Sequence, residues 1–201
     1  MKKAFNPAIK DKTTNEIFDG ISDLLINDNP DLLTITNISK RSGYSIGNIY
    51  HHFKNIDEVL KEFVVSRFRS RTHEIQKYLN EIPPSATAKE IIKGLVDEAF
   101  SYLTKKLPRT MFLKFAGTIL NDSEIIKRID EVCMSSVDLV ETLINKNETN
   151  TFKKLTHAEI ELAILMCSSA VRKPITQNHK LALSKSHKEQ VAAILIASFA
   201  R

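Results

Sequence analysis

Apolar positions recur at helical spacing along most of the chain, and no segment shows the alternation expected of a strand. Residues 12–27 give the first example, because their apolar side chains fall on one helix face at Ile17, Ile21, Leu24 and Leu25. Thr13 and Glu16 have the spacing of a capping box, which predicts that this helix begins at Lys12. The pattern as a whole predicts an all-α protein.

The same spacing predicts about nine helices, separated by polar and proline-rich breaks. Pro30 lies in the first break, and "EIPPSAT", residues 81–87, ends a long helix. Pro174 is expected to close the helix that Thr156 caps, and Ser184 or Ser186 to start the last one. The further helices are expected at 35–41, 46–52, 56–80, 86–106, from Pro108 into Met111–Phe115, 121–146, 156–171 and from 184 or 186 to the C-terminus.

Two domains are expected. An N-terminal three-helix domain, residues 10–70, would contain a helix-turn-helix at 34–53, followed by a linking helix at 56–80. Residues 86–201 would form a second helical domain, for ligand binding and dimerisation.

The helix-turn-helix prediction rests on small residues at fixed places. Thr34 is expected to cap the first of the two helices, and Gly43 to take the left-handed conformation that ends it. Ser45 would cap the second helix and leave amide groups of its first turn available for phosphates. Gly47 in that turn costs about 1 kcal/mol relative to alanine, which is understandable if the helix backbone must approach a nucleic acid closely.

Charge supports this interpretation. The 201 residues have a net charge of +5, and no acidic residue occurs from Leu32 to Ile56, where Lys40, Arg41 and Lys54 are present. Such a window is suited to phosphate contact, so double-stranded DNA is the expected partner. No apolar run approaches the roughly 18 residues of a membrane span, and the first residues do not form a signal peptide, so we expect a cytoplasmic protein without a membrane partner.

The segment "TITNISKRSGYSIGNIYHHFKNIDEVL" resembles the TetR family of bacterial transcriptional regulators. The matching positions are in register: Thr34, Ile38, Gly43, Ser45, Gly47, Tyr50, His52 and Phe53. Ile56 replaces a lysine that often reaches a phosphate in the family, so one backbone contact is in doubt. The resemblance covers about residues 10–70, and the remainder agrees in length and helical pattern.

The resemblance implies a homodimer whose third helix enters the major groove of DNA. Thr34 and Thr36 would contact phosphates or bases from the preceding helix. Ile46 stands at a base-reading position, where its side chain could meet a thymine methyl group. The implied DNA-binding residues are Thr34, Thr36, Ser45, Ile46, Gly47, Asn48, Tyr50, His51, His52 and Lys54.

The last two helices are apolar almost all round, so they require burial on more than one side. The resemblance implies that they form the dimer interface, while burial within one chain is the alternative. The expected interface residues are Ile160, Ala163, Ile164, Cys167, Val191, Ile194, Leu195 and Ser198.

Residues of the middle helices could line a pocket for a small apolar or amphipathic effector, or could be ordinary core. The candidates are Phe100, Tyr102, Met111, Phe112, Phe115, Met134 and Leu165. His157, Glu161 and Asp138 are polar residues that could accompany them. Cys133 and Cys167 have no zinc-site spacing and are expected to be buried thiols.

The sequence therefore predicts a ligand-responsive repressor that binds a (pseudo)palindromic operator as a dimer. The alternative is a helical adaptor that uses the helix-turn-helix for protein contact. No catalytic motif is present, so we expect no enzyme activity, no cofactor and no metal.

Overall fold

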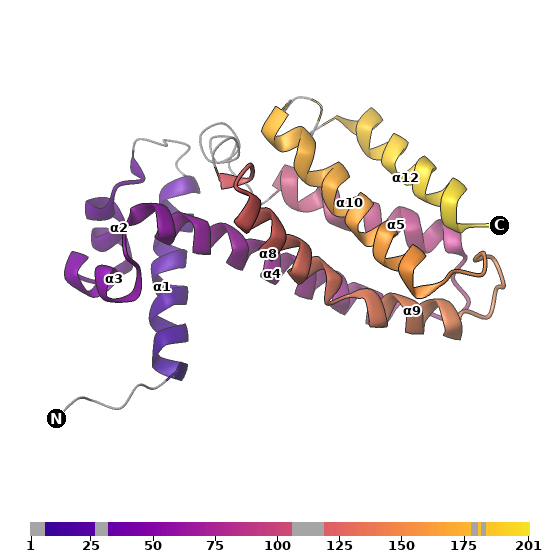
Figure 1. Ribbon diagram of the computed structural model, residues 1–201, viewed down its shortest axis with the longest axis horizontal. Helices are drawn as coiled ribbons and strands as arrows, with labels where there is room; N and C mark the ends of the chain where they lie inside the picture. Colours follow the sequence, from indigo (N-terminus) through magenta and orange to yellow (C-terminus); the bar gives the residue numbers. More distant parts are fainter. Residues whose placement is uncertain (1–6, 27–31, 106–118, 178–180, 182–183) are drawn as a thin grey trace. The chain divides into compact units, whose positions relative to one another are not determined.

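The computed structural model describes residues 7–26, 32–105, 119–177, 181 and 184–201. The chain forms two compact units, which divide between Val64 and Val65, inside helix α4. The first unit contains α1 (Pro7–Ile26), α2 (Ile35–Ser42), α3 (Ile46–His52) and the start of α4 (Ile56–Glu81). The second contains the rest of α4, α5 (Ala88–Lys105), α8 (Ser123–Met134), α9 (Val137–Lys146), α10 (His157–Gln177) and α12 (Lys185–Phe199) (Figure 1).

The predicted all-α class is confirmed. Within the described residues, the one β-type pairing is an isolated antiparallel bridge between Phe152 and Ala200. No described helix combines the length and apolarity that a membrane crossing requires.

The core of the first unit lies where α1 meets α2 and α3 (Figure 1). Aromatic rings extend this core, because Phe18 packs against Phe53 and Phe63 with ring centroids 6.1 and 5.7 Å away. Aliphatic side chains at helical spacing complete it with no exposed surface, namely Ile17, Ile21, Ile38 and Ile49. Helices α2 and α3 are therefore fixed by apolar contacts on the side that faces α1.

Helix α1 begins at Pro7, not at Lys12 as the capping-box pattern predicted. Proline is favoured in the first turn of a helix, where its missing N–H has no partner to lose. Thr13 lies inside the helix and is 7 % exposed. It is therefore an interior residue of α1, and its prediction as a cap was wrong.

The single helix predicted over residues 121–146 is broken at Ser135 and Ser136 into α8 and α9. The Ser135 hydroxyl donates to the carbonyl of Val132 at 2.7 Å, so a side chain takes up an acceptor at the end of α8. The Gln76 side-chain amide donates to Ser135 and Ser136 from α4. Serine hydroxyls compete in this way with helical backbone hydrogen bonds, which explains the break.

Helix α10 continues through Pro174 to Gln177, so the prediction that this proline closes the helix was wrong. Proline in a helix interior removes the hydrogen bond to the carbonyl four residues earlier, here that of Ala170. The ring of His187, on α12, lies 3.0 Å from this oxygen through its Nε2. A carbonyl can only accept, so Nε2 donates and replaces the missing N–H.

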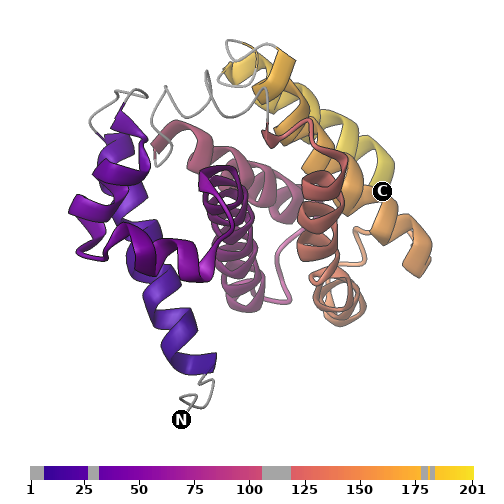
Figure 2. The same ribbon diagram turned by 60° about the vertical axis from the view of Figure 1, so that its left-hand side comes forward.

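In the second unit, α8 and α9 pack against α10, and α12 packs against α5 (Figures 1 and 2). Glycine allows one close approach between α4 and α5. The hydroxyl end of Tyr78 occupies the space that a side chain at Gly94 would fill. Tyr78 is half-buried there, and burial raises the pKa of its hydroxyl.

Candidate nucleic-acid interface and effector cavity

The helix-turn-helix forms with the predicted caps. The Thr34 hydroxyl accepts from the amide of Asn37 at 3.3 Å, and that of Ser45 accepts from Asn48 at 3.1 Å. Gly43 has a φ of 77°, and its amide donates to the carbonyl of Ser39 at 3.1 Å. A left-handed residue costs glycine nothing in steric energy, so α2 ends sharply and α3 can start in a new direction.

One face of α1 supports this turn. Gly20 lies against Ser42, so closely that an added Cβ would stand 3.0 Å from the Ser42 backbone nitrogen. On either side of Gly20, the Glu16 carboxylate accepts from the Tyr44 hydroxyl and that of Asp23 accepts from Arg41 at 3.0 Å. The hydrogen bond to Glu16 raises the pKa of Tyr44.

The supporting roles of Glu16 and Asp23 were not predicted, although the sequence contains a signal for them. Both acids lie at helical spacing around a glycine inside a helix, which marks a face where another backbone approaches. Arg41, included in the acid-free window, is thereby ion-paired to a residue outside that window. The positive charge that residues 32–56 present in the fold is therefore smaller than the sequence alone suggests, because Asp23 pairs with Arg41.

The outward side of α3 carries large apolar groups. Ile46 and Tyr50 are 38 % and 44 % exposed, whereas Ile49 between them is completely buried. Around Gly47 there is open space, with nothing within 4 Å of an added Cβ. The predicted DNA-binding residues Thr34, Thr36, Ser45, Asn48, His51 and Lys54 are also exposed, and His52 is half-buried. The structure thus brings the whole predicted set together on α2, α3 and the residues that join and follow them.

A capping box formed by Asn55 and Glu58 fixes the chain after α3. Asn55 accepts from the Glu58 amide at 2.8 Å, and the Glu58 carboxylate accepts from the backbone amide of Lys54. The Lys54 amide is therefore held by the protein, while its side chain extends into solvent. Ile56, at the position of the usual lysine, is half-buried.

The second unit contains a partly open apolar cavity of about 200 Å³. Its walls come from α4, α5, α8, α9, α10 and α12, and include Phe68, Ile75, Leu95, Val140, Ile164 and Leu195. We refer to it below as the cavity.

The pocket residues predicted from the sequence do not line the cavity. Phe100 is buried beside His187, with ring centroids 5.7 Å apart, and contributes to the core. Met134 and Leu165 are half-buried outside the cavity wall. Met111, Phe112, Phe115 and the side chain of Tyr102 lie outside the described residues. The described candidates therefore lie outside the cavity wall, whose aromatic and sulfur-containing members are other residues, namely Phe68, Phe152, Phe199, Cys133 and Cys167.

The few polar groups on the cavity wall have partners within the chain. Arg71 is 9 % exposed and donates to Glu74 and Glu98 at 2.9 and 3.3 Å. Ser168 donates to Asp130 at 3.4 Å and accepts a long hydrogen bond from the Cys133 thiol. The wall therefore offers mainly aliphatic surface.

Both cysteines line the cavity as free thiols, as expected. Burial raises the pKa of Cys133, and burial raises that of Cys167 to about 11. Because the thiolate is the reactive form, the raised pKa values reduce the reactivity of both thiols.

The predicted interface residues on α10 and α12 divide into two groups. Ile160, Val191 and Leu195 are buried within the chain. Ile160 and Leu195 also line the cavity, together with Ala163, Ile164 and Cys167. Only Ile194 and Ser198 of the predicted set are exposed. The exposed large apolar residues that the prediction missed on α10 are Leu162 and Met166, at 57 % and 39 %.

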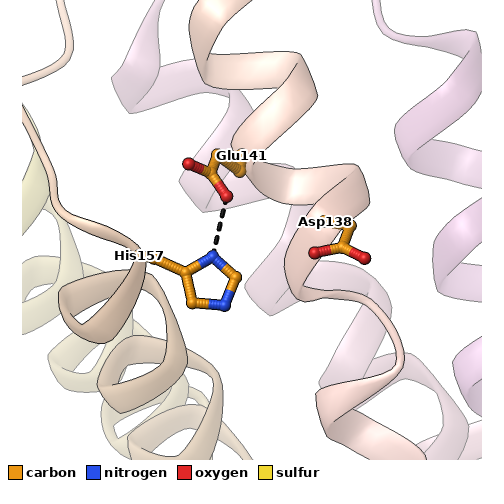
Figure 3. A group of neighbouring side chains, drawn as sticks. All are labelled: Asp138, Glu141 and His157. Atoms are coloured by element: carbon orange, nitrogen blue, oxygen red, sulfur yellow. Dashed lines mark hydrogen bonds and ion pairs between the residues drawn. The ribbon is translucent and has the colours of Figure 1, made fainter.

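The polar trio expected near a pocket lies on the surface instead. The ring of His157, at the start of α10, stands beside Asp138 and Glu141 of α9 (Figure 3). His157 Nδ1 is 2.8 Å from the Glu141 carboxylate, and Nε2 is 3.6 Å from Glu161. The hydrogen bond to Glu141 raises the pKa of His157. Asp138, Glu141 and His157 have the proximity of metal ligands, within 4.8 Å, and the ion pair between His157 and Glu141 already joins two of them.

Comparison with known proteins agrees with this geometry. Residues 17–63, which run from the middle of α1 into the start of α4, match the family described as "Bacterial regulatory proteins, tetR family". No curated protein matches the chain.

Solved structures of regulators share the fold over nearly the whole chain. The repressor QsdR of R. erythropolis, from the TetR family, is 13 % identical with a TM-score of 0.60, covering 94 % of both chains. FadR from Bacillus subtilis, in complex with stearoyl-CoA, is 18 % identical with a TM-score of 0.59, covering 91 % of this chain and 97 % of its own. SmeT, the repressor of a multidrug efflux pump of Stenotrophomonas maltophilia, is 18 % identical with a TM-score of 0.59, covering 94 % and 90 %. The family match over residues 17–63 and the helix-turn-helix geometry lead to one conclusion: the chain carries a TetR-family DNA-binding domain and is a DNA-binding transcriptional regulator.

Proposed function

We propose that the chain is a ligand-responsive repressor that binds a (pseudo)palindromic operator as a dimer. The observation that carries this proposal is the outward face of α3, where Ile46 and Tyr50 are exposed beside an uncovered Gly47. A short helix that buries Ile49 inward and presents large side chains outward is suited to entering the major groove.

Each exposed group has a role in this proposal. Ile46 and Asn48 face base edges, where an isoleucine can contact a thymine methyl and an asparagine can bond adenine. Gly47 lets the backbone approach. The remaining residues, Thr34, Thr36, Ser45, Tyr50, His51, His52 and Lys54, hold the phosphates and so fix the helix in register.

Dimerisation would use the exposed apolar residues of α10 and α12. Leu162, Met166 and Ile194 give these helices a surface that water solvates poorly. In a two-fold dimer, two recognition helices would read half-sites about 34–36 Å apart.

The effector would bind in the cavity. FadR was solved with stearoyl-CoA, which supports the use of this fold for effector binding. A ligand that prefers one arrangement of the dimer shifts the population toward it, and DNA is released if the half-site spacing no longer matches.

A gel shift with the DNA upstream of the protein's own gene tests the proposal. Specific binding should weaken steeply with salt, because each phosphate contact releases counterions. Tyr50→Ala and Gly47→Glu should abolish binding, while Ser70→Glu, which adds one negative charge at an exposed position of α4, should have little effect. If the protein does not bind DNA at any salt concentration tested, the adaptor function is favoured instead.

A further inference from the structure

We propose that the effector is a small, uncharged, apolar molecule about the size of one substituted aromatic ring. The inference rests on the proposed function and specifies the ligand class of the cavity.

The size of the cavity sets the first limit. Pockets for drug-sized ligands typically have about 300–1,000 Å³, whereas an apolar cavity of roughly 150 Å³ is enough to bind benzene. At about 200 Å³, the cavity lies just above the smaller value. A single ring with short substituents fills it, and a long acyl chain does not.

The wall sets the second limit. Aliphatic and aromatic side chains from six helices form nearly all of it, so the main gain on binding is the removal of apolar ligand surface from water. The hydroxyl of Ser168 is engaged with Asp130, and Ser136 accepts from Gln76 at 3.2 Å. A ligand rich in hydrogen-bonding groups would lose its water without replacement, which is costly.

Charge sets the third limit. Arg71 is the charged side chain on the wall within the described residues, and it forms ion pairs with Glu74 and Glu98. An anionic ligand that bound Nη1 or Nη2 of the guanidinium would displace one of these carboxylates. The displaced glutamate and the ligand would then repel each other, and both anions would compete for one cation. A cationic ligand would meet the arginine itself, so neither sign of charge is favoured.

The thiols complete the argument. Cys133 and Cys167 face the cavity, but burial raises the pKa of both thiols. A covalent adduct with an electrophile needs the thiolate. Binding is therefore reversible and non-covalent.

Toluene, benzoate and hexadecanoate are suitable probes. Toluene and benzoate each have one ring with one small substituent and differ in charge, and hexadecanoate tests whether a long acyl chain binds. We expect toluene at about ten times its Kd to raise the Tm by about 3–6 °C, and the two acids to leave it unchanged. Ala163→Leu places extra atoms in the cavity and should weaken toluene binding at least tenfold. Ala158→Leu is the matched control, because Ala158 is exposed on the same helix.

Ala99→Val, a smaller addition to the cavity wall, replaces Ala163→Leu if circular dichroism shows that the latter does not fold. Tighter binding of benzoate or hexadecanoate than of toluene overturns the proposal, as does binding of no probe or equal binding to both leucine variants. A gel shift on the same samples separates the two proposals. If the native protein does not bind the DNA, the proposed repressor function is refuted. If toluene binds the protein without weakening the DNA complex, small uncharged apolar molecules are refuted as the effector class.

Discussion

His187 donates a hydrogen bond from α12 to the Ala170 carbonyl of α10, the acceptor that Pro174 leaves without a backbone donor. The ring also packs edge-on against Phe100 of α5. One side chain thus connects three helices of the second unit, and it makes an interior proline tolerable.

His187→Leu should lower the free energy of unfolding by about 1–3 kcal/mol, since a buried carbonyl is left unsatisfied. In a Pro174→Ala background, the restored amide at position 174 can bond Ala170, so the same substitution should cost less. Urea unfolding of the four proteins at one concentration measures this coupling. Equal costs in both backgrounds would show that His187 does not compensate for the proline.

Two glycines of the first unit should respond oppositely to alanine. Gly20→Ala should destabilise the protein by about 1–3 kcal/mol, because its Cβ would stand 3.0 Å from Ser42 atoms that cannot easily move. Gly47→Ala meets no atom within 4 Å and should be neutral or stabilising by up to about 1 kcal/mol.

The same Gly47→Ala variant should bind operator DNA more weakly than the native protein, because its methyl group separates the helix from the groove. Urea midpoints and gel shifts, run side by side, distinguish the two effects. Native-like DNA affinity of Gly47→Ala would remove the argument that glycine is needed at this position for close approach.

Stability should depend on the protonation of His157. Its pKa is raised in the folded protein above the ordinary value of 6.5, first by the hydrogen bond to Glu141. The stabilisation is therefore fully present below pH 6.5 and disappears as the pH rises through the folded-state pKa. The Tm advantage of the native protein over Glu141→Gln should be larger at pH 5.5 than at pH 8.5.

An NMR titration of the His157 ring gives an independent measure of the same pair. Its midpoint should lie above 6.5 in the native protein and move down in Glu141→Gln. A midpoint that is unaffected by the substitution would mean that the pair seen in the structure is not maintained in solution.

Charge on the exposed apolar residues of α10 and α12 should prevent dimerisation. Leu162→Glu and Ile194→Glu each introduce a carboxylate at a position whose native side chain is more than half exposed in the single chain, so the monomer should fold normally. Native mass spectrometry at micromolar concentration should show monomers for both and dimers for Ser70→Glu, which adds the same charge at an exposed position of α4. Dimers that persist in the first two variants would place the interface elsewhere.

The sequence predicts best those features that neighbouring residues determine. The caps at Thr34 and Ser45 and the left-handed turn at Gly43 follow from side chains within three or four positions, and all three are confirmed. Pro174 could not be interpreted in this way, because the group that compensates for it belongs to another helix. The support of the turn by Glu16 and Asp23 likewise requires knowing which face of α1 meets α2.

The cavity was the least predictable feature. Its residues are distributed over six helices and the loop before α10, and most of them taken alone are ordinary apolar core residues. A cavity is a property of the volume left between helices, which depends on their packing distances and not on residue type. Large side chains such as Phe100 are therefore a poor guide to it.

The contact of Tyr78 with Gly94 has a consequence for the evolution of the chain. A side chain at position 94 would collide with the hydroxyl end of Tyr78, so position 94 can change only if the tyrosine moves or is replaced by a smaller residue. Among relatives of this chain, a larger residue at position 94 should be inherited together with a smaller one at position 78. Covariation between these two positions would record how closely α4 and α5 pack in each lineage.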